Sequence, residues 1–195
     1  PCGTLFPYTT LFRSLAAVCV CRRLGCSLER LAAAAANYRG LKRRFEVVGS
    51  VGGITVIDDF AHNPAKLSAA IGTAQNMGRR VLAVFQPHGF GPTRFLKDEL
   101  VETLGRVLRQ QDTFYALPIY YAGGTATRDV SSEDIVGPLV SRGVRAEAPT
   151  GREACIAAIA RGVGKGDVVL CMGARDPSLP GFAANVLAAV RHGTR

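Results

Sequence analysis

The feature that most constrains the fold of this chain is a repeated alternation of short apolar stretches with amphipathic stretches of helical period. Stretches with the length and composition of strands occupy five ranges, 53–60, 79–87, 113–120, 144–149 and 167–174. Stretches typical of helices follow them, at 64–77, 95–110, 131–143, 151–163 and 179–192. Nearly continuous apolar strands that alternate with helices predict an α/β fold, with a mostly parallel sheet that carries helices on both faces.

An antiparallel edge is expected at the start of this sheet. The β-rich run FEVVGSV (45–51) is separated from GITVIDDF (53–60) by a turn at Gly52-Gly53. A glycine pair between two such runs is typical of a β-hairpin. We therefore expect the first two strands, near residues 45–60, to pair in antiparallel fashion.

Residues 15–38 are expected to be helical. The alanine-rich stretch LERLAAAAANY (28–38) strongly favours helix. Gly25-Cys26-Ser27 interrupts the helical pattern, and Ser27 is suited to cap the second helix. The sequence thus predicts a pair of helices ahead of the α/β domain.

The first 14 residues, PCGTLFPYTTLFRS, show neither a helical nor a strand period and lack the charged start of a secretory signal. Back-translation of Thr4 to Ser14 gives a string that resembles a widely used sequencing adapter, read in frame. We interpret residues 1–14 as a non-native artefact and leave them out of the fold prediction. The rest is then expected to be the C-terminal part of a longer reading frame.

Charge and cysteine content argue against several classes of protein. The net charge of +9 suggests nucleic acid, but eight of the 24 basic residues lie in residues 1–44, four of them in RGLKRR (39–44). A local basic cluster suits a small phosphate-bearing ligand, so no nucleic-acid partner is expected. No apolar run approaches the ~20 residues of a membrane span, so no membrane association is expected. The six cysteines lack zinc-site spacing and favour the cytoplasm.

Polar, glycine-rich segments follow four of the predicted strands: AHNP (61–64), HGFGPTR (88–94), YAGGTATRDV (121–130) and RDPSLPG (175–181). In doubly wound sheets, ligands bind at the carboxyl ends of the strands. These four segments, which are called strand exits below, together predict a binding site at that edge. The motifs GxxxxGK[ST], GxSxG and GxGxxG are absent, and nucleophilic catalysis is unsupported.

The acidic pair at the first exit is open to more than one interpretation. Asp58 and Asp59 could bind ribose hydroxyls, hold a metal or act as a base, or they could form a solvated strand end. His62 precedes a helix start, where a histidine is more often a loop or capping residue than a catalyst.

The other exits carry cationic side chains that suit an anionic ligand. His88 and Arg94 flank a Gly-Phe-Gly-Pro segment and could together fix a carboxylate or a phosphate. Arg175 and Asp176 could equally form an ordinary turn with an internal ion pair.

Four segments together resemble the carboxyl-terminal part of a Mur ligase: RGLKRRFEV, VIDDFAHNP, VFQPHGFGPTR and IYYAGGTATRDVSSEDI. The resemblance is colinear and covers roughly residues 15–195. DDFAHNP is similar to a motif of the wider family, which includes folylpolyglutamate synthase. FQPH and IYYAG…SSEDI resemble the branch that adds L-alanine to UDP-N-acetylmuramate.

This resemblance implies an organisation and an activity. It implies a Rossmann-like C-terminal domain at 42–195, preceded at 15–41 by the helical end of the ATP-binding central domain. The implied activity is that of an ATP-dependent amide ligase of peptidoglycan precursor synthesis, which joins an amino acid to UDP-N-acetylmuramate through an acyl phosphate, with Mg²⁺ screening the phosphoryl group. The N-terminal and central domains with the phosphate loop are missing, so this chain alone is expected to be inactive.

The resemblance also implies roles for individual residues, none of them as a metal ligand. Those that match nucleotide-binding positions of the family are Arg44, Asp59, His62 and Asn63. Those that match positions near the amino acid or the other substrate are His88 and Arg94, and Arg175 is added as a candidate for a substrate carboxylate.

The chain departs from the alanine-adding branch at two places. Gly89 and Pro92 stand where that branch carries arginines, and GARDPS (173–178) stands where it has GAGD. Either Arg175 takes over a substrate carboxylate, or the acceptor amino acid differs. Two alternatives stay open: a murein tripeptide-recycling ligase of the same family, and a non-enzymatic nucleotide-binding α/β module.

Overall fold

The computed structural model describes residues 9–38 and 40–193, and the chain divides into two compact units, Pro1–Leu41 and Lys42–Arg195. The first unit holds the helices α1 (Thr9–Arg23) and α2 (Leu28–Asn37). The Ser27 hydroxyl accepts a hydrogen bond from the Arg30 N–H at 3.3 Å, so the predicted helix break and cap are confirmed. Of the residues interpreted as an artefact, 1–8 lie outside the described residues and 9–14 lie in α1. Their origin stays a prediction.

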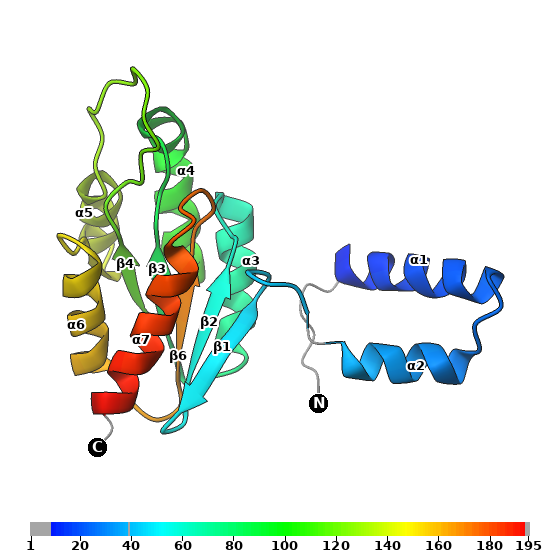
Figure 1. Cartoon of the computed structure of the whole chain (residues 1–195). Helices are drawn as coiled ribbons and strands as arrows, with labels where there is room; N and C mark the ends of the chain where they lie inside the picture. The colour runs from blue at the N-terminus through cyan, green and yellow to red at the C-terminus, as the bar shows by residue number, and fades with distance from the viewer. Residues whose placement is uncertain (1–8, 39, 194–195) are drawn as a thin grey trace. The chain divides into compact units, whose positions relative to one another are not determined.

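The second unit is a six-stranded sheet with five helices (Figure 1). Its strands are β1 (Glu46–Val51), β2 (Ile54–Asp59), β3 (Arg80–Phe85), β4 (Thr113–Ala116), β5 (Arg145–Glu147) and β6 (Asp167–Met172). Its helices are α3 (Pro64–Gln75), α4 (Phe90–Val107), α5 (Glu133–Ser141), α6 (Arg152–Gly162) and α7 (Leu179–Gly193). The strand order is β1-β2-β6-β3-β4-β5, and every neighbouring pair is parallel except β1 and β2. The predicted α/β fold with an antiparallel edge near 45–60 is confirmed.

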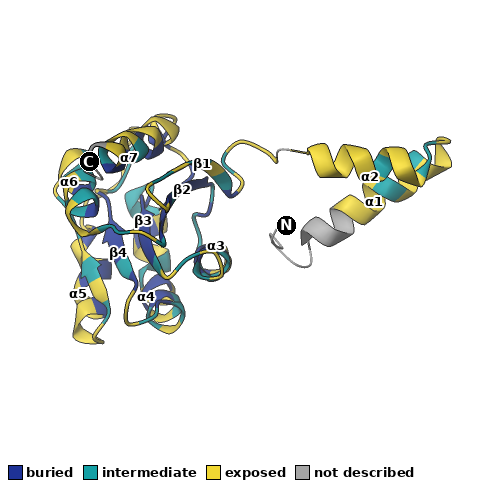
Figure 2. Ribbon diagram, turned by 90° about the horizontal axis from the view of Figure 1, so that it is seen from below, coloured by how far each residue is buried: buried dark blue, intermediate teal, exposed yellow. Residues whose placement is uncertain are grey.

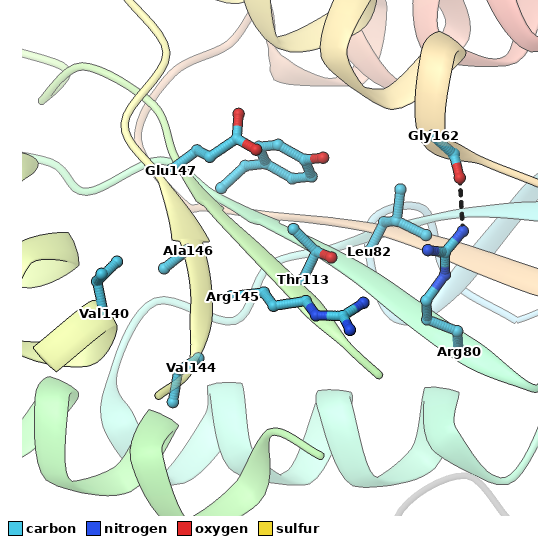
Figure 3. Close-up of a pocket in the computed structure, with 10 residues that line it drawn as sticks. Arg80, Leu82, Thr113, Val140, Val144, Arg145, Ala146, Glu147 and Gly162 are labelled. Carbon is cyan, nitrogen blue, oxygen red and sulfur yellow. Dashed lines mark hydrogen bonds between the residues drawn. The ribbon is translucent and has the colours of Figure 1, made fainter. Parts of the chain in front are cut away.

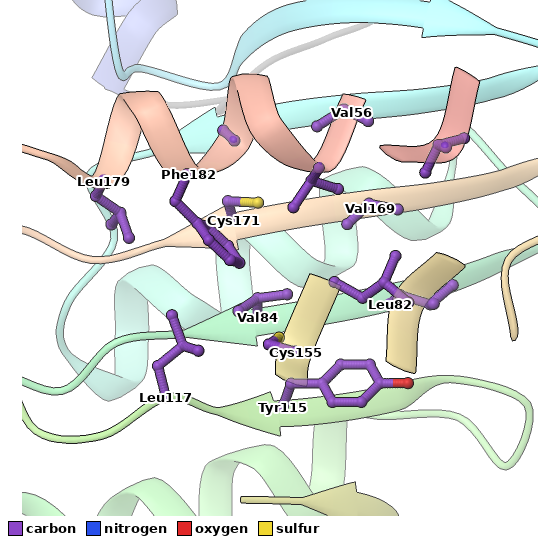
Figure 4. Packing of buried hydrophobic residues seen from close by; sticks show 14 of the residues in the cluster. Val56, Leu82, Val84, Tyr115, Leu117, Cys155, Val169, Cys171, Leu179 and Phe182 are labelled. Carbon is purple, nitrogen blue, oxygen red and sulfur yellow. The ribbon is translucent and has the colours of Figure 1, made fainter. Parts of the chain in front are cut away.

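Helices cover both faces of this sheet. In Figure 1, α6 and α7 lie on one face, and α3, α4 and α5 lie on the other. The four inner strands are largely buried, the edge strands β1 and β5 are not, and the outer helix surfaces are exposed (Figure 2). Under α6 and α7, strand residues such as Val84 and Cys171 pack against Phe182 (Figure 4). This layering places β6, all six of whose residues are buried, at the centre of the unit.

Two helix starts correct the sequence prediction. Helix α4 begins at Phe90 rather than at 95, because Gly89 adopts φ +70° and Pro92 fits a first turn, where its missing N–H costs nothing. Helix α5 begins at Glu133 rather than at 131, and the hydroxyl of Ser132 makes no cap bond but donates to the Leu117 carbonyl at 2.6 Å. The Asp134 carboxylate accepts from the N–H and hydroxyl of Ser131, which fixes that turn.

Buried carboxylates fix the amino-terminal ends of the strands. Asp112 accepts from the Val81 N–H at 2.8 Å and from the side chains of Gln75 and Arg109. Burial raises the pKa of Asp112, but these hydrogen bonds outweigh burial and bring it below its ordinary value. Asp167 likewise pairs with Arg79 and Arg80. The starts of β3 and β6 are thereby fixed at the edge opposite the polar strand exits.

Within the part of the chain that the structure describes, no helix combines the length and apolar character needed to cross a membrane.

Candidate functional site

The exits of β2, β3, β4 and β6 meet at the carboxyl edge of the sheet. The exits of β3 and β4 are joined by two backbone hydrogen bonds, from Gly89 N–H to the Tyr120 carbonyl and from Tyr120 N–H to the Pro87 carbonyl, each 2.8 Å. The exits of β2 and β6 are joined by a bond from Gly173 N–H to the Asp59 carbonyl at 3.2 Å. The parallel strands thus present their predicted polar segments side by side.

Two predicted site residues, His62 and His88, are brought into contact. Their ring centroids lie 5.8 Å apart in an edge-on arrangement, and His62 Nδ1 lies 2.8 Å from the Phe60 carbonyl oxygen. Burial, together with the charges of His62 and Arg175, lowers the pKa of His88 below its ordinary value. A neutral imidazole at neutral pH can accept a proton or a hydrogen bond from a ligand.

Arg175 is exposed at the start of the turn after β6, and its charge acts on His88. It forms no ion pair with any residue in the described ranges. The alternative of an internal Arg175–Asp176 pair is wrong, because Asp176 pairs with Arg152 at 2.6 Å and accepts from Ser178. Arg175 is therefore available to an anionic ligand at this edge of the sheet.

Asp59 is buried, with 5% of its surface exposed, and has a structural role that the sequence did not predict. Its carboxylate accepts from the Phe45 N–H and from the Ala61 N–H, each at 2.7 Å. Burial raises its pKa, although these bonds and the charges of Arg44 and Arg43 oppose the rise. Each carboxylate oxygen keeps a lone pair, so the ribose contact remains chemically feasible and stays a prediction.

Asn63 is the N-cap of α3, where its side-chain oxygen accepts from the Lys66 N–H at 3.0 Å. This bond uses one lone pair of the carbonyl oxygen, so the other lone pair and the amide NH₂ can still contact a ligand. The predicted nucleotide contact of Asn63 stays a prediction.

Arg43, which the sequence did not single out, is the arginine that enters the site from the linker segment. Its guanidinium donates to the Gly173 carbonyl at 2.7 Å and pairs with Asp58 at 3.3 Å. The predicted ligand, Arg44, is exposed and lies over the Phe60 ring at 5.9 Å. The adjacent basic residues of RGLKRR were a usable signal, but sequence alone does not tell which of them turns inward.

Arg94 contacts a different partner from the histidine pair. It lies on α4, where its guanidinium pairs with Asp129 and donates to the Thr127 carbonyl at 3.2 Å. Arg128 of the same loop lies over the Tyr121 ring at 5.1 Å. Arg94 thus fastens the loop after β4 to the start of α4, and its predicted substrate contact stays a prediction.

The described residues offer no cluster for a metal ion, and a hollow among them lies away from the histidines. Within the described ranges, no group of three or more His, Cys, Asp or Glu side chains could hold a metal ion. A shallow hollow of about 350 Å³ lies elsewhere, between the starts of β3, β4 and β5, at Arg80, Thr113 and Arg145 (Figure 3). The Arg80 guanidinium there donates to the Gly162 carbonyl at 2.6 Å. The hollow is at the amino edge of the sheet and shares no residue with the histidine cluster.

Comparison with known proteins identifies the family of this chain. Residues 43–175 match the family described as Mur ligase, glutamate ligase domain. The chain belongs to the Mur ligase family. The matched range covers the candidate site, including Arg43, Arg44, His62, His88 and Arg175.

Individual Mur ligases are similar over a larger part of the chain. The UDP-N-acetylmuramate–L-alanine ligase of Gloeobacter violaceus is 40% identical over 139 residues, which are 71% of this chain and 28% of the relative. The solved UDP-N-acetylmuramate–alanine ligase of Thermotoga maritima has the same fold, with a TM-score of 0.73 and 22% identity over 95% of this chain and 38% of its own. A Mur ligase of the same organism, solved with ADP, has a TM-score of 0.55 and 21% identity over 92% of this chain and 37% of its own. The chain spans about a third of the length of such relatives.

Proposed function

We propose that this chain is the C-terminal part of an ATP-dependent ligase that joins L-alanine to UDP-N-acetylmuramate in cytoplasmic peptidoglycan precursor synthesis. The observation that supports this best is the cluster of His62, His88 and Arg175 at the carboxyl edge of a Mur ligase domain. Similarity to the L-alanine ligase of G. violaceus favours the alanine-adding branch.

The residues divide into two groups in this proposal. Arg44 and Asp59 lie beside Phe60 and suit the nucleotide, with a cation for phosphate and a carboxylate for ribose hydroxyls. His62 and the amide of Asn63 extend that group toward the loop. His88, Arg94 and Arg175 are assigned to the amino acid or the sugar carboxylate.

The chemistry asked of these residues is binding and orientation. ATP supplies the activated phosphoryl group, and the reaction makes an acyl phosphate that the amine of the amino acid attacks. Arg175 would hold a carboxylate, and neutral His88 would accept a proton or hydrogen bond from the incoming ammonium group. The residues that hold Mg²⁺ are assigned mostly to the central domain.

We further propose that this chain is inactive by itself. Its sequence has no GxxxxGK[ST] phosphate loop, and phosphoryl transfer depends on holding the β- and γ-phosphates together with Mg²⁺. Incubation of the chain with ATP, Mg²⁺, UDP-N-acetylmuramate and L-alanine should give no amino-acid-dependent phosphate release. Release at an ordinary enzymatic rate of ~1–10³ per second would contradict this part of the proposal.

A chimera tests the function itself. Residues 42–195 would replace the matching C-terminal part of the G. violaceus ligase, and phosphate release would be measured with L-alanine and with a panel of other amino acids. We expect release that depends on L-alanine, and a large loss of rate in the His88→Ala chimera. The host without any C-terminal part is the negative control.

The same chimera separates the alternatives. Release with a murein tripeptide but not with L-alanine would favour the recycling ligase. A folded chimera without release on any acceptor would contradict the ligase proposal and favour a non-enzymatic module. Circular dichroism establishes that each chimera is folded before its activity is compared.

A further inference from the structure

We infer that Arg43 is a positioning residue, which holds the turn at residues 173–176 and so fixes the place of Arg175 at the carboxyl edge of the sheet. Its importance for catalysis rests on the proposed function, but the positioning itself is a property of this chain. Arg43 was not predicted as a site residue, and it lies next to Arg44, which was.

The guanidinium of Arg43 joins two strand exits. Nη2 donates to the Gly173 carbonyl at 2.7 Å, and Nη1 donates to the Ala174 carbonyl at 3.3 Å. Nε pairs with Asp58 of β2 at 3.3 Å, and the guanidinium carbon lies 5.0 Å from the Phe60 ring centroid. One planar group with several donors thus holds the two peptide carbonyls that immediately precede Arg175.

The backbone that carries this side chain is itself fixed. The Arg43 N–H donates to Glu46 Oε2 at 2.8 Å, and the Arg43 carbonyl accepts from the Phe60 N–H at 2.9 Å. Arg43 has φ +56°, which is uncommon for a residue other than glycine. A strained residue held on both sides offers a defined origin for its side chain.

The buried carboxylate of Asp58 helps to hold the Arg43 guanidinium in place. Its side chain is 1% exposed, and its Oδ1 has no hydrogen-bond partner among the described residues. The Arg43 side chain, which is 16% exposed, is the cation that pairs with this buried carboxylate. A buried carboxylate with one partner favours keeping that partner in place.

Arg175 depends on its backbone for orientation. Its side chain is exposed and forms no ion pair with a described residue, so the turn is what fixes where its charge lies relative to His88. The turn is close-packed at Gly173, where an added Cβ would lie 2.7 Å from Leu179 Cδ2 and 3.2 Å from the Gln86 carbonyl oxygen. The bonds from Arg43 act on this turn directly before Arg175.

The test uses the ring proton signals of His88, followed by NMR as a function of pH in the full chain. Arg175→Ala should raise the pKa of His88 by about half a unit, as expected for the loss of a nearby positive charge. Arg43→Lys should give a similar rise, because one ammonium group keeps the charge but cannot span both carbonyls and Asp58. The double variant should shift His88 no further than Arg175→Ala alone.

Arg44→Ala is the matched control, since it removes the neighbouring arginine without touching the 173–176 turn, and it should leave His88 unchanged. An unchanged His88 in Arg43→Lys, or additive shifts in the double variant, would overturn the inference. If Arg43→Lys does not fold, Asp58→Asn carries the test: the rise caused by Arg175→Ala should be smaller in the Asp58→Asn background than in the original chain, and an equal rise would overturn the inference.

These measurements need no substrate. A negative result therefore removes the positioning role and leaves the ligase proposal standing. An inactive chimera together with the expected His88 shifts would contradict the ligase proposal and leave the positioning role of Arg43 standing.

Discussion

His62 and His88 lie in ring contact, although they follow strands that are not neighbours in the sheet. Each stands three residues beyond the end of its strand, His62 after β2 and His88 after β3, and β6 lies between those strands. The pair therefore lies across the carboxyl end of β6, whose exit carries Arg175. This relationship puts three predicted residues in one place and explains why the site depends on strand order as well as on motif.

The first prediction concerns pH and His88. Because the folded state lowers its pKa below the ordinary 6.5, the unfolded chain binds more protons there, and stability falls as pH falls below about 6.5. His88→Gln should remove this contribution, so its urea unfolding free energy should decline less between about pH 7.5 and pH 5 than that of the original chain. Parallel curves for the two proteins would show that His88 titrates normally.

The second prediction concerns Asp59. Asp59→Ala leaves the N–H groups of Phe45 and Ala61 without their acceptor, which should lower the unfolding free energy by about 2–4 kcal/mol. Asp59→Asn keeps one acceptor oxygen and should lose less. In the active chimera, loss of ribose hydrogen bonds should raise the KM for ATP roughly ten- to a hundredfold. An unchanged KM in a folded Asp59→Ala chimera would assign Asp59 a structural role alone.

The third prediction concerns the turn after β6. Gly173→Ala should lower the unfolding free energy by about 1–3 kcal/mol, because the new Cβ would meet Leu179 and the Gln86 carbonyl. Gly181→Ala, on the exposed side of α7 with no atom within 4 Å of the added Cβ, is the control and should be neutral or stabilising. Urea denaturation of both variants makes the comparison. Equal stability of the two would mean that the turn relaxes freely.

The fourth prediction concerns the loop after β4. Arg94→Ala removes the contacts with Asp129 and the Thr127 carbonyl, so cleavage within residues 121–129 by a protease of broad specificity should become faster. The melting temperature should change little, since both side chains are exposed and such pairs contribute little to stability. Arg106→Ala, which breaks an exposed pair with Glu102 on the same helix, is the control and should leave loop cleavage unchanged.

Much of the fold was predictable because it depends on patterns that sequence displays directly. The apolar strands, the Gly52-Gly53 hairpin and the Ser27 cap all follow from local chemistry and are confirmed. The predicted start of α4 at residue 95 was wrong because Gly89 and Pro92 are residue types typical of loops. In the structure, the positive φ of Gly89 and a proline in the first turn let the helix begin at Phe90. Local signals fail where a residue type suits both a loop and a helix start.

The candidate site was predictable as a place but less so as a set of contacts. Motifs at strand ends located His62, His88 and Arg175 correctly at one edge of the sheet. The inward turn of Arg43 and the pairing of Arg94 with Asp129 depend on long-range packing, which one sequence does not display. The bond that Asp59 accepts from the Phe45 N–H has the same origin, since it follows from how the segment before β1 lies against β2, whereas the bond from the Ala61 N–H is local.

The fifth prediction concerns the boundary between the two units, after Leu41. A chain of residues 42–195 should fold with the same stability as the second unit of the full chain, because that unit has its own core. Amide hydrogen exchange of β6, whose residues are all buried, reports on that stability without interference from α1 and α2. Equal protection of Val169 in both chains is the expected result.

A deletion five residues longer is the matched control for that boundary. A chain of residues 47–195 also loses Arg43 and Phe45, and Phe45 is 4% exposed with its N–H bonded to Asp59. Loss of a buried phenylalanine costs about 3–5 kcal/mol, so β6 should exchange far faster in this chain. If residues 42–195 exchanged as fast as 47–195, the second unit would depend on the helices before it. If both chains were protected like the full chain, the linker residues 43–46 would not belong to its core.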